Sequence, residues 1–281
     1  MPRACGSSGR PLTPRVRWSR QKNINTNTDS VIALDTLLAP FDPISLKQMD
    51  NVKLLDRVDT KFMFREELLP AILERMRPEY YVLEINGQRY NHYETLYFDT
   101  HNFGLYLRHH NGKLNRFKFR ARRYVESNLH FFEVKFKNNK GRTIKDRIKR
   151  PEITPVIADK AEELVRSASN VDPSTLQAQL WVDYVRITFV SKTSQERLTV
   201  DTRLTYRNDG RQVDYNGLVI AEVKQGSTRD KSIFVDLMRE HSIPQRSISK
   251  YCLGVISLNP EVKRNRFKPT LLYLQKLLRA S

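Results

Sequence analysis

Charged and apolar side chains alternate every second residue in six separate stretches of this chain, and this pattern constrains the fold more than any other feature. Residues i and i+2 of a β-strand point to the same face, so each stretch predicts a strand with one charged and one apolar face. The charged positions are mostly Arg and Lys, with an occasional carboxylate. The six stretches are 57–62, 118–122, 133–137, 145–148, 201–204 and 221–224.

The remaining periodicity predicts further strands and a set of helices. Runs rich in Tyr and β-branched residues at 80–85 and 89–98 flank Asn86-Gly87, a strong signal for a hairpin. Other strands are expected at 115–124, 129–137, 142–149, 181–190, 197–206 and 218–224. Helices are expected at 66–76, 102–110, 155–180 with a break at Asp172-Pro173, 231–240, 247–258 and 268–279. This order predicts an α+β fold with mostly antiparallel strands, and it leaves open whether the sheet closes into a barrel.

The net charge of +18 calls for an anionic partner, but much of it lies near the two ends. Residues 1–28 hold six basic residues and no acid, and residues 261–281 hold six basic residues and one acid. The body is therefore only moderately basic, which weakens the case for a nucleic-acid partner. We interpret 1–28 as a flexible basic N-terminal arm and 29–281 as a single domain, because no long linker divides the body.

Composition excludes several other classes. The 2 cysteines are too few for a disulfide framework or a zinc site, which favours a reducing, cytoplasmic location. No long apolar run is present, so we expect no transmembrane segment, and export of a product would need a separate membrane partner. No G-x-x-x-x-G-K-[ST] loop exists, which argues against a P-loop ATPase.

The charged strand faces allow two interpretations. Each face alone is ordinary for the solvated side of an antiparallel sheet. If the sheet closes, however, the faces point at one another, and so many cations in one lumen would need a polyanion. Phosphate chains meet that need, because Arg binds phosphate through parallel hydrogen bonds and Lys acts as a point charge. Carboxylates on the same faces are candidates to hold Mg²⁺ or Mn²⁺; these are Asp59, Glu133, Asp201 and Glu222.

Eight short motifs occur in an order that suggests a family. They are Arg57-Val-Asp59-Thr-Lys61-Phe62, Tyr97-Phe98-Asp99, Lys118-Phe-Arg120-Ala-Arg122, Phe132-Glu133-Val-Lys135, Ile144-Lys145-Asp146-Arg147, Asp201-Thr-Arg203, Ala221-Glu222-Val-Lys224 and Ser249-Lys250-Tyr251. Each motif alone is weak. Together, over about residues 45–258, the chain resembles the VTC domain, the polyphosphate polymerase domain of the triphosphate tunnel metalloenzyme (CYTH-like) superfamily.

The resemblance implies a closed antiparallel eight-stranded β-barrel, with helices packed outside and a C-terminal helical segment. It implies an ATP-dependent phosphotransferase that passes the γ-phosphate of ATP to a growing inorganic polyphosphate chain and uses a divalent metal, Mn²⁺ or Mg²⁺. The implied catalytic, phosphate-binding wall is Lys61, Arg120, Arg122, Lys135, Lys145, Arg147 and Arg186. Further implied ligand contacts are Arg57, Arg203, Lys224, Ser249 and Lys250, and the implied metal ligands are Glu222, Glu133 and Asp59.

One departure and three alternatives accompany this hypothesis. Ser247 stands where the resemblance expects a basic residue, with Arg246 beside it. An inorganic triphosphatase on the same fold and a non-catalytic polyphosphate-binding protein both fit the motifs. A nucleic-acid binder would use the basic arm and tail, but aromatic platforms between exposed basic residues are then expected. Here the basic residues alternate with core aromatics instead, so we expect no nucleic-acid partner.

Overall fold

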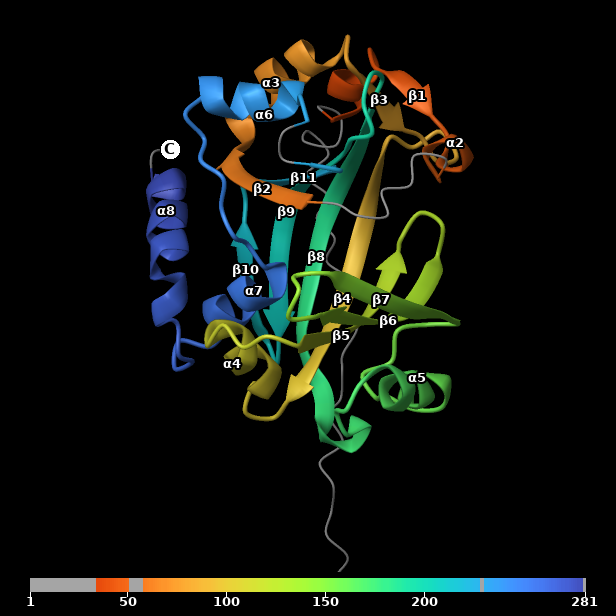
Figure 1. Cartoon of the computed structure of the whole chain (residues 1–281), viewed down its shortest axis with the longest axis vertical. Coiled ribbons are helices and arrows are strands. Elements are labelled where there is room, and N and C mark those ends of the chain that lie inside the picture. Colours follow the sequence, from red (N-terminus) through yellow and green to blue (C-terminus); the bar gives the residue numbers. More distant parts are fainter. Residues whose placement is uncertain (1–33, 51–57, 228–229, 280–281) are drawn as a thin grey trace, which may run out of the picture.

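A computed structural model describes residues 34–50, 58–227 and 230–279, so the arm proposed at 1–28 lies outside the described residues. The strands are β1 (Asp42–Ile44), β2 (Val58–Arg65), β3 (Tyr80–Leu83), β4 (Tyr90–Thr100), β5 (Arg116–Tyr124), β6 (Leu129–Lys137), β7 (Thr143–Arg150), β8 (Leu176–Ser191), β9 (Arg197–Asn208), β10 (Arg211–Tyr215) and β11 (Leu218–Gln225). They form one sheet in the order β2-β11-β9-β8-β4-β5-β6-β7 (Figure 1). β10 pairs with β9, and β3 pairs with β8 and, in parallel, with β1.

The sheet is open in the described part of the chain, so the closed eight-stranded barrel implied by the resemblance is wrong. β2 pairs with β11 alone and β7 with β6 alone. The outer edge of β2 is already occupied, because the Lys61 carbonyl accepts from the Arg246 N–H at 2.8 Å. The Met63 carbonyl accepts from the Tyr273 hydroxyl at 3.1 Å. A ladder between β2 and β7 would need these same backbone groups, so closure is blocked.

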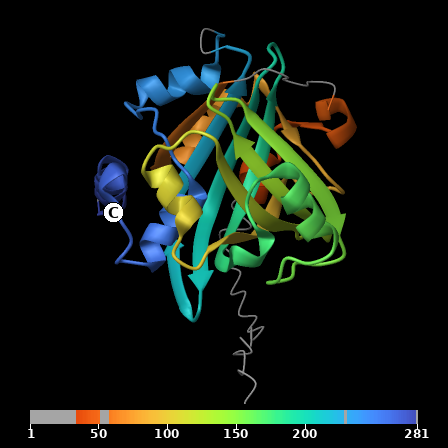
Figure 2. The ribbon, with the colours of Figure 1, turned by 60° about the horizontal axis from the view of Figure 1, so that its bottom comes forward.

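The open sheet is nevertheless strongly curved. Figures 1 and 2 show β5, β6 and β7 crossing β8 and β9 at a steep angle. The register shifts between Tyr97 and Phe98 on β4, and again where β9 fits an extra residue opposite β8. Arg203 lies in this second irregularity with a φ of 53°. Bulges of this kind bend a strand and increase its twist, so the sheet acquires a concave and a convex face.

Helices pack against both faces of the sheet. They are α2 (Leu46–Asp50), α3 (Leu69–Met76), α4 (Gly104–His110), α5 (Lys160–Ala168), α6 (Ile233–Glu240), α7 (Lys250–Leu258) and α8 (Lys268–Arg279). α3 and α6 share a core with the apolar side of β2 and β11, for example Phe234 with Phe62. α5 packs against β6 and β7, and its Val165 shares a core with Phe119 of β5. No helix in the described residues is long and apolar enough to cross a membrane.

α7 packs against the concave side instead. Its Tyr251 and Val255 share a core with Leu180 of β8 and Tyr206 of β9. Gly254 allows this approach, because a Cβ there would lie 2.5 Å from Tyr206 Cδ1 and 2.7 Å from Leu180 Cδ2. α7 therefore fills one end of the concave face and fixes where its own N-terminus lies.

The hairpin predicted at Asn86-Gly87 is wrong. Both residues take positive φ angles, 51° and 76°, and the turn forms. Beyond the turn, however, only one bridge follows, between Ile85 and Gln88. β3 and β4 instead pair one after the other along the same edge of β8, which has 16 residues. β8 begins at Leu176, so the helix predicted at 155–180 is shortened to α5.

Candidate functional site

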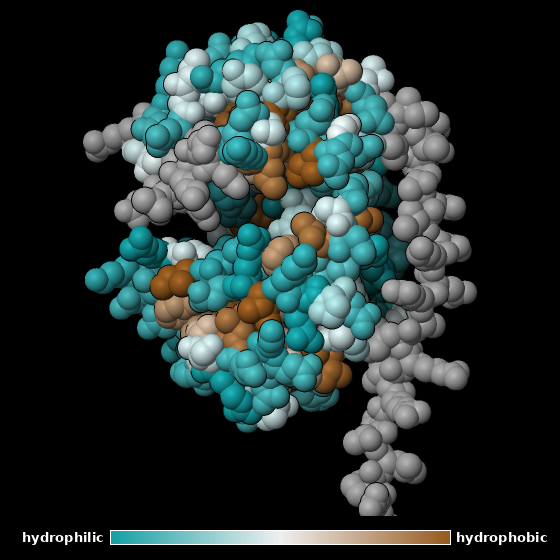
Figure 3. Space-filling view, turned by 90° about the vertical axis from the view of Figure 1, so that its right-hand side faces the viewer, coloured by the Kyte–Doolittle hydropathy of each residue, from teal (hydrophilic) through white to brown (hydrophobic). Residues whose placement is uncertain are grey.

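The concave face, called the inner face from here on, collects most of the predicted site residues. Sequence neighbours of these residues, such as Phe62, Phe119 and Val134, lie in the convex-side cores, so alternation turns the charged side chains inward. The basic residues of the inner face are Lys61, Lys118, Arg120, Arg122, Lys135, Lys145, Arg147, Arg186 and Lys224, joined by Lys250 of α7. Figure 3 shows the molecule hollowed between its upper and lower parts, with hydrophilic side chains around much of the opening.

Glu133 is a fully buried carboxylate held by two cations. It accepts from Arg120 Nε at 2.6 Å through one oxygen and from Lys145 Nζ at 2.9 Å through the other. Burial alone would raise the pKa of Glu133, but the charges of Arg120, Arg122 and Lys145 outweigh burial and hold that pKa well below its usual range. Both oxygens are engaged, so Glu133 orients its basic neighbours in this geometry.

Asp201 has the same role on the opposite wall. Arg186 donates to its two oxygens at 2.6 and 2.7 Å, and Lys250 donates to Oδ2. Burial opposes ionisation of Asp201, but the charges of Arg186 and Lys250 lower its pKa to about 2. The carboxylate thus fixes a guanidinium of β8 and an ammonium of α7 at one place.

Glu222 differs from these two carboxylates because its contacts are looser. Its oxygens lie 3.4 Å from Lys61 Nζ and 3.3 Å from Lys224 Nζ. Although burial would raise its pKa, the charges of Lys224, Lys61, Arg186 and Lys135 hold the pKa well below the usual range. Glu222 is therefore ionised at neutral pH in the most cationic part of the face.

Lys135 shows how close the walls of the inner face lie. Burial, followed by the charges of Arg120 and Lys118, lowers its pKa to about 7, while Glu222 opposes this shift. Lys61 on the far end of the sheet contributes to the same shift. The curvature therefore brings β6 within electrostatic reach of β2 and β11.

The N-terminus of α7 joins this face. Ser249 is the N-cap, and its hydroxyl accepts from the Cys252 N–H at 3.2 Å and from Lys118 Nζ at 2.9 Å. Lys250 follows and contacts Asp201. Two residues implied by the resemblance therefore lie at one end of the inner face.

A buried carboxylate anchors this helix to the sheet. Asp99 accepts from the Leu105 and Tyr106 N–H groups at 2.8 and 2.9 Å, at the start of α4. It also accepts from the Tyr251 hydroxyl of α7. Asp99 thereby links β4, α4 and α7, and fixes the position of Ser249 and Lys250.

Some predicted residues lie elsewhere, and some residues of the face were missed. Arg57 lies outside the described residues. Arg203 sits in the β9 irregularity, where its charge acts on Glu66 and on Tyr90 of a convex-side core. Asp59 lies near Lys224: burial lowers the pKa of Lys224, and the charges of Glu222 and Asp59 oppose this shift. Sequence reasoning assigned no role to Lys118, although its two-residue spacing from Arg120 was the available signal.

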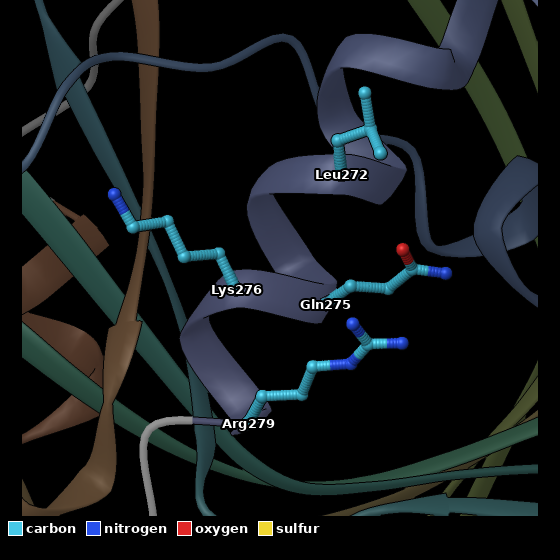
Figure 4. A pocket seen from close by; sticks show the side chains of 4 residues that line it. All are labelled: Leu272, Gln275, Lys276 and Arg279. Carbon is cyan, nitrogen blue, oxygen red and sulfur yellow. The ribbon is translucent and has the colours of Figure 1, made fainter.

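Two surface hollows lie apart from the inner face. One, of about 400 Å³, runs along α8 beside Leu272, Gln275, Lys276 and Arg279, and Figure 4 shows these side chains spreading apart rather than converging. The other, of about 480 Å³, lies between α4 and the segment that precedes α8, and includes Phe103, Arg211 and Lys263. Neither contains the carboxylates and paired cations of the inner face.

The fold and the inner face together define an α+β protein whose curved sheet presents a cationic surface suited to a polyanion. The model of the VTC domain matches residues 56–259, well over half of the chain, and the chain belongs to this family. Membership supports a function that involves polyphosphate or triphosphate.

Several solved structures are similar to this chain at low sequence identity. A protein from Vibrio parahaemolyticus, provisionally described as an adenylate cyclase, is 16% identical, with 72% of this chain and 99% of that chain covered and a TM-score of 0.44. A protein from Pyrococcus horikoshii OT3 is 16% identical over 72% of this chain and 99% of its own, with a TM-score of 0.41. A protein from Hippeastrum, described as having a dominant triphosphatase activity, is 14% identical over 73% and 100%, with a TM-score of 0.45. No curated protein matches the chain.

A divalent cation fits the inner face through Glu222. Within residues 34–50, 58–227 and 230–279, no three His, Cys, Asp or Glu side chains converge as a ligand set. Mg²⁺ and related ions are commonly held by one or two carboxylates together with substrate phosphate oxygens, which needs no such set. Glu222 is ionised and loosely paired, whereas both oxygens of Glu133 are taken by cations.

Proposed function

We propose that the protein is an ATP-dependent polyphosphate polymerase that transfers the γ-phosphate of ATP to a growing inorganic polyphosphate chain on the inner face. The observation that carries this proposal is the imbalance of charge there. The basic side chains far outnumber the carboxylates, and Glu133 and Asp201 are already held by cations. A surface of this kind needs an extended anion, and membership of the VTC domain family supports polyphosphate as that anion.

The reaction needs positioning and positive charge rather than acid–base chemistry. A terminal oxygen of the chain, already ionised, attacks the γ-phosphorus, and the bond from that phosphorus to the β–γ bridging oxygen breaks. ADP leaves with the bonding electrons, so no proton has to move. The described residues therefore need no general base, and the cations of the inner face are sufficient to bind and align the phosphates.

Buried ion pairs keep these cations in position. Arg120 is held by Glu133 and Arg186 by Asp201, so neither guanidinium has to reorganise when phosphate arrives. Each guanidinium retains N–H groups for phosphate oxygens, because a planar fork has five donors. Lys61 and Lys135 add charge near Glu222.

Glu222 would hold the divalent cation, Mn²⁺ or Mg²⁺, which would supply positive charge to the transferring phosphate oxygens. Ser249 and Lys250 hold phosphate at the α7 end, beside Lys118. The proposal takes 29–281 as one unit and a cytoplasmic location, where ATP is available, with ATP and inorganic polyphosphate as its partners.

Phosphorus NMR of the purified protein incubated with ATP and Mn²⁺ tests the proposal. Internal-chain phosphate signals that accumulate together with ADP are the expected result. Free phosphate without chain growth would instead assign the site to an inorganic triphosphatase, in which water takes the attacking position. Unchanged ATP, together with tight polyphosphate binding, would make the protein a binding protein.

A further inference from the structure

Four aromatic rings cross the inner face beside the phosphate-binding cations. Tyr184 and Tyr93 stack with ring centres 5.1 Å apart and an interplanar angle of 12°. The Tyr124 ring lies 4.9 Å from Tyr93, and Phe131 lies 5.9 Å from Tyr124 at 90°. The rings belong to β8, β4, β5 and β6 in turn, so they form a continuous row across four neighbouring strands.

Two of these rings have a clear structural role. Tyr184 is buried, and its hydroxyl lies 3.1 Å from Arg122 Nη2, which donates to it. Arg122 and Arg186 both lie over the Tyr93 ring, with the guanidinium carbons 5.2 and 5.1 Å from its centre. Tyr184 and Tyr93 therefore orient arginines.

Tyr124 and Phe131 hold no buried arginine in the described part of the chain. Both lie at the outer end of the row and are only half-buried. Among the residues that the structure describes, the one cation over them is Arg147, whose guanidinium carbon is 4.6 Å from the centre of Phe131 and whose side chain is itself exposed. An anionic phosphate gains no favourable contact from an aromatic ring. Two partly exposed rings beside the phosphate-binding residues therefore suit a part of the substrate that is not phosphate.

The spacing along β6 suits a nucleotide. Phe131, Glu133 and Lys135 share the inner face at successive i+2 positions. Four residues of strand cover about 13 Å, which a triphosphate joined to a ribose can bridge. Arg120 and Lys145 lie at Glu133, midway along this path.

We propose that Tyr124 and Phe131 form the seat for the nucleobase of the nucleoside triphosphate, which stacks against these rings beside Arg147. The inference rests on the proposed function and deepens it, because it fixes the direction of the nucleotide. The base lies at the Phe131 end, and the γ-phosphate lies toward Lys135 and Glu222. Aromatic stacking tolerates any base, so the seat selects nucleotides over inorganic triphosphate rather than adenine over guanine.

Calorimetric titration of two ligands tests the seat. The ligands are the β,γ-imido analogue of ATP and inorganic tripolyphosphate, and the proteins are the wild type, Phe131→Leu and Tyr124→Leu. We expect each variant to bind the ATP analogue about tenfold more weakly while its tripolyphosphate affinity stays unchanged. The matched control is Phe136→Leu, because Phe136 lies on the same strand, stacks on Phe117 of the convex side and is also half-buried. This control should bind both ligands like the wild type.

The other outcomes overturn the inference in distinguishable ways. Equal losses for both ligands would mean that the rings only position cations. No loss for either ligand would mean that the base lies elsewhere, while the proposed function would stand. A wild type that binds neither ligand would overturn the proposed function itself.

A second comparison needs no variant. Ribose 5-triphosphate lacks the base, and we expect it to bind the wild-type protein about tenfold more weakly than ATP. Equal affinity for the two would overturn the seat even if the leucine variants failed to fold.

Discussion

Lys135 on β6 and Glu222 on β11 act on each other's pKa across the inner face, although four strands separate β6 from β11 in the sheet order. The curvature of the sheet creates this relationship. It makes the protonation of Lys135 depend on the other charges that the face holds. Any bound polyanion therefore changes the protonation of the protein as well as the occupancy of the site.

Polyanion binding is expected to take up protons above pH 7. Burial and the neighbouring Arg120 and Lys118 lower the pKa of Lys135 to about 7, so the free protein loses this charge as pH rises. A bound polyanion favours the charged form, raises the pKa and draws a proton from the buffer. Tripolyphosphate affinity should fall from pH 7 to pH 9, and calorimetry at pH 8 in two buffers of different ionisation enthalpy measures the uptake. Lys135→Arg stays charged, so an equal uptake in that variant would contradict the assignment.

Glu222→Gln should lower turnover by about 100-fold or more while leaving the fold intact. The substitution removes the ionised carboxylate proposed to hold the metal, but its contacts with Lys61 and Lys224 are loose. ADP release at increasing Mn²⁺ concentrations measures the effect. The control is Glu67→Gln, an exposed glutamate 2.7 Å from Arg65. Activity in Glu222→Gln equal to that of the control would remove Glu222 from the metal site.

Arg120→Ala is expected to destabilise the protein by about 3–5 kcal/mol, because fully buried Glu133 then loses the closer of its two ion-pair partners and keeps Lys145. Urea unfolding measures the loss. Adding Glu133→Gln to this variant removes the stranded charge, so part of the stability should return. Tripolyphosphate affinity should stay low in the double variant, because the guanidinium is still missing. A single variant as stable as the wild type would show that Glu133 is reached by solvent.

Gly254→Ala tests the packing that positions α7. The added methyl group would meet the Tyr206 and Leu180 side chains below 3 Å, so we expect a loss of about 1–3 kcal/mol in the free energy of unfolding. Gln275→Ala, at an exposed position of α8, should change stability by less than about 0.5 kcal/mol. If both variants unfold at the same urea concentration, α7 is not held tightly against β8 and β9.

The strand faces could be predicted from the sequence because their period is short and local. β6 was predicted at 129–137 and is found there, and the same is true of α8 at 268–279. The inner-face set from Lys61 to Lys224 follows from this alternation together with the family motifs. Arg203 shows where the rule ends. It lies two residues after Asp201, but the intervening irregularity turns it away from that residue's face.

Whether the sheet closes could not be predicted, because closure depends on contacts between residues far apart in the chain. The backbone of Arg246 and the hydroxyl of Tyr273 occupy the edge of β2, and no periodic pattern in the sequence signals either contact. The prediction of a hairpin at Asn86-Gly87 failed for a related reason. The turn formed as expected, but the long β8 offered β3 and β4 an alternative partner.

β7 ends the sheet with an edge that makes no ladder in the part of the chain that the structure describes. Uncovered edges are where separate copies of a protein add to one another and grow into aggregates. Beside this edge stand Lys145, Arg147 and Lys149, so two copies brought edge to edge would oppose rows of like charge. The cations that suit the face to an anion thus also discourage self-association, and the sheet remains protected without closing.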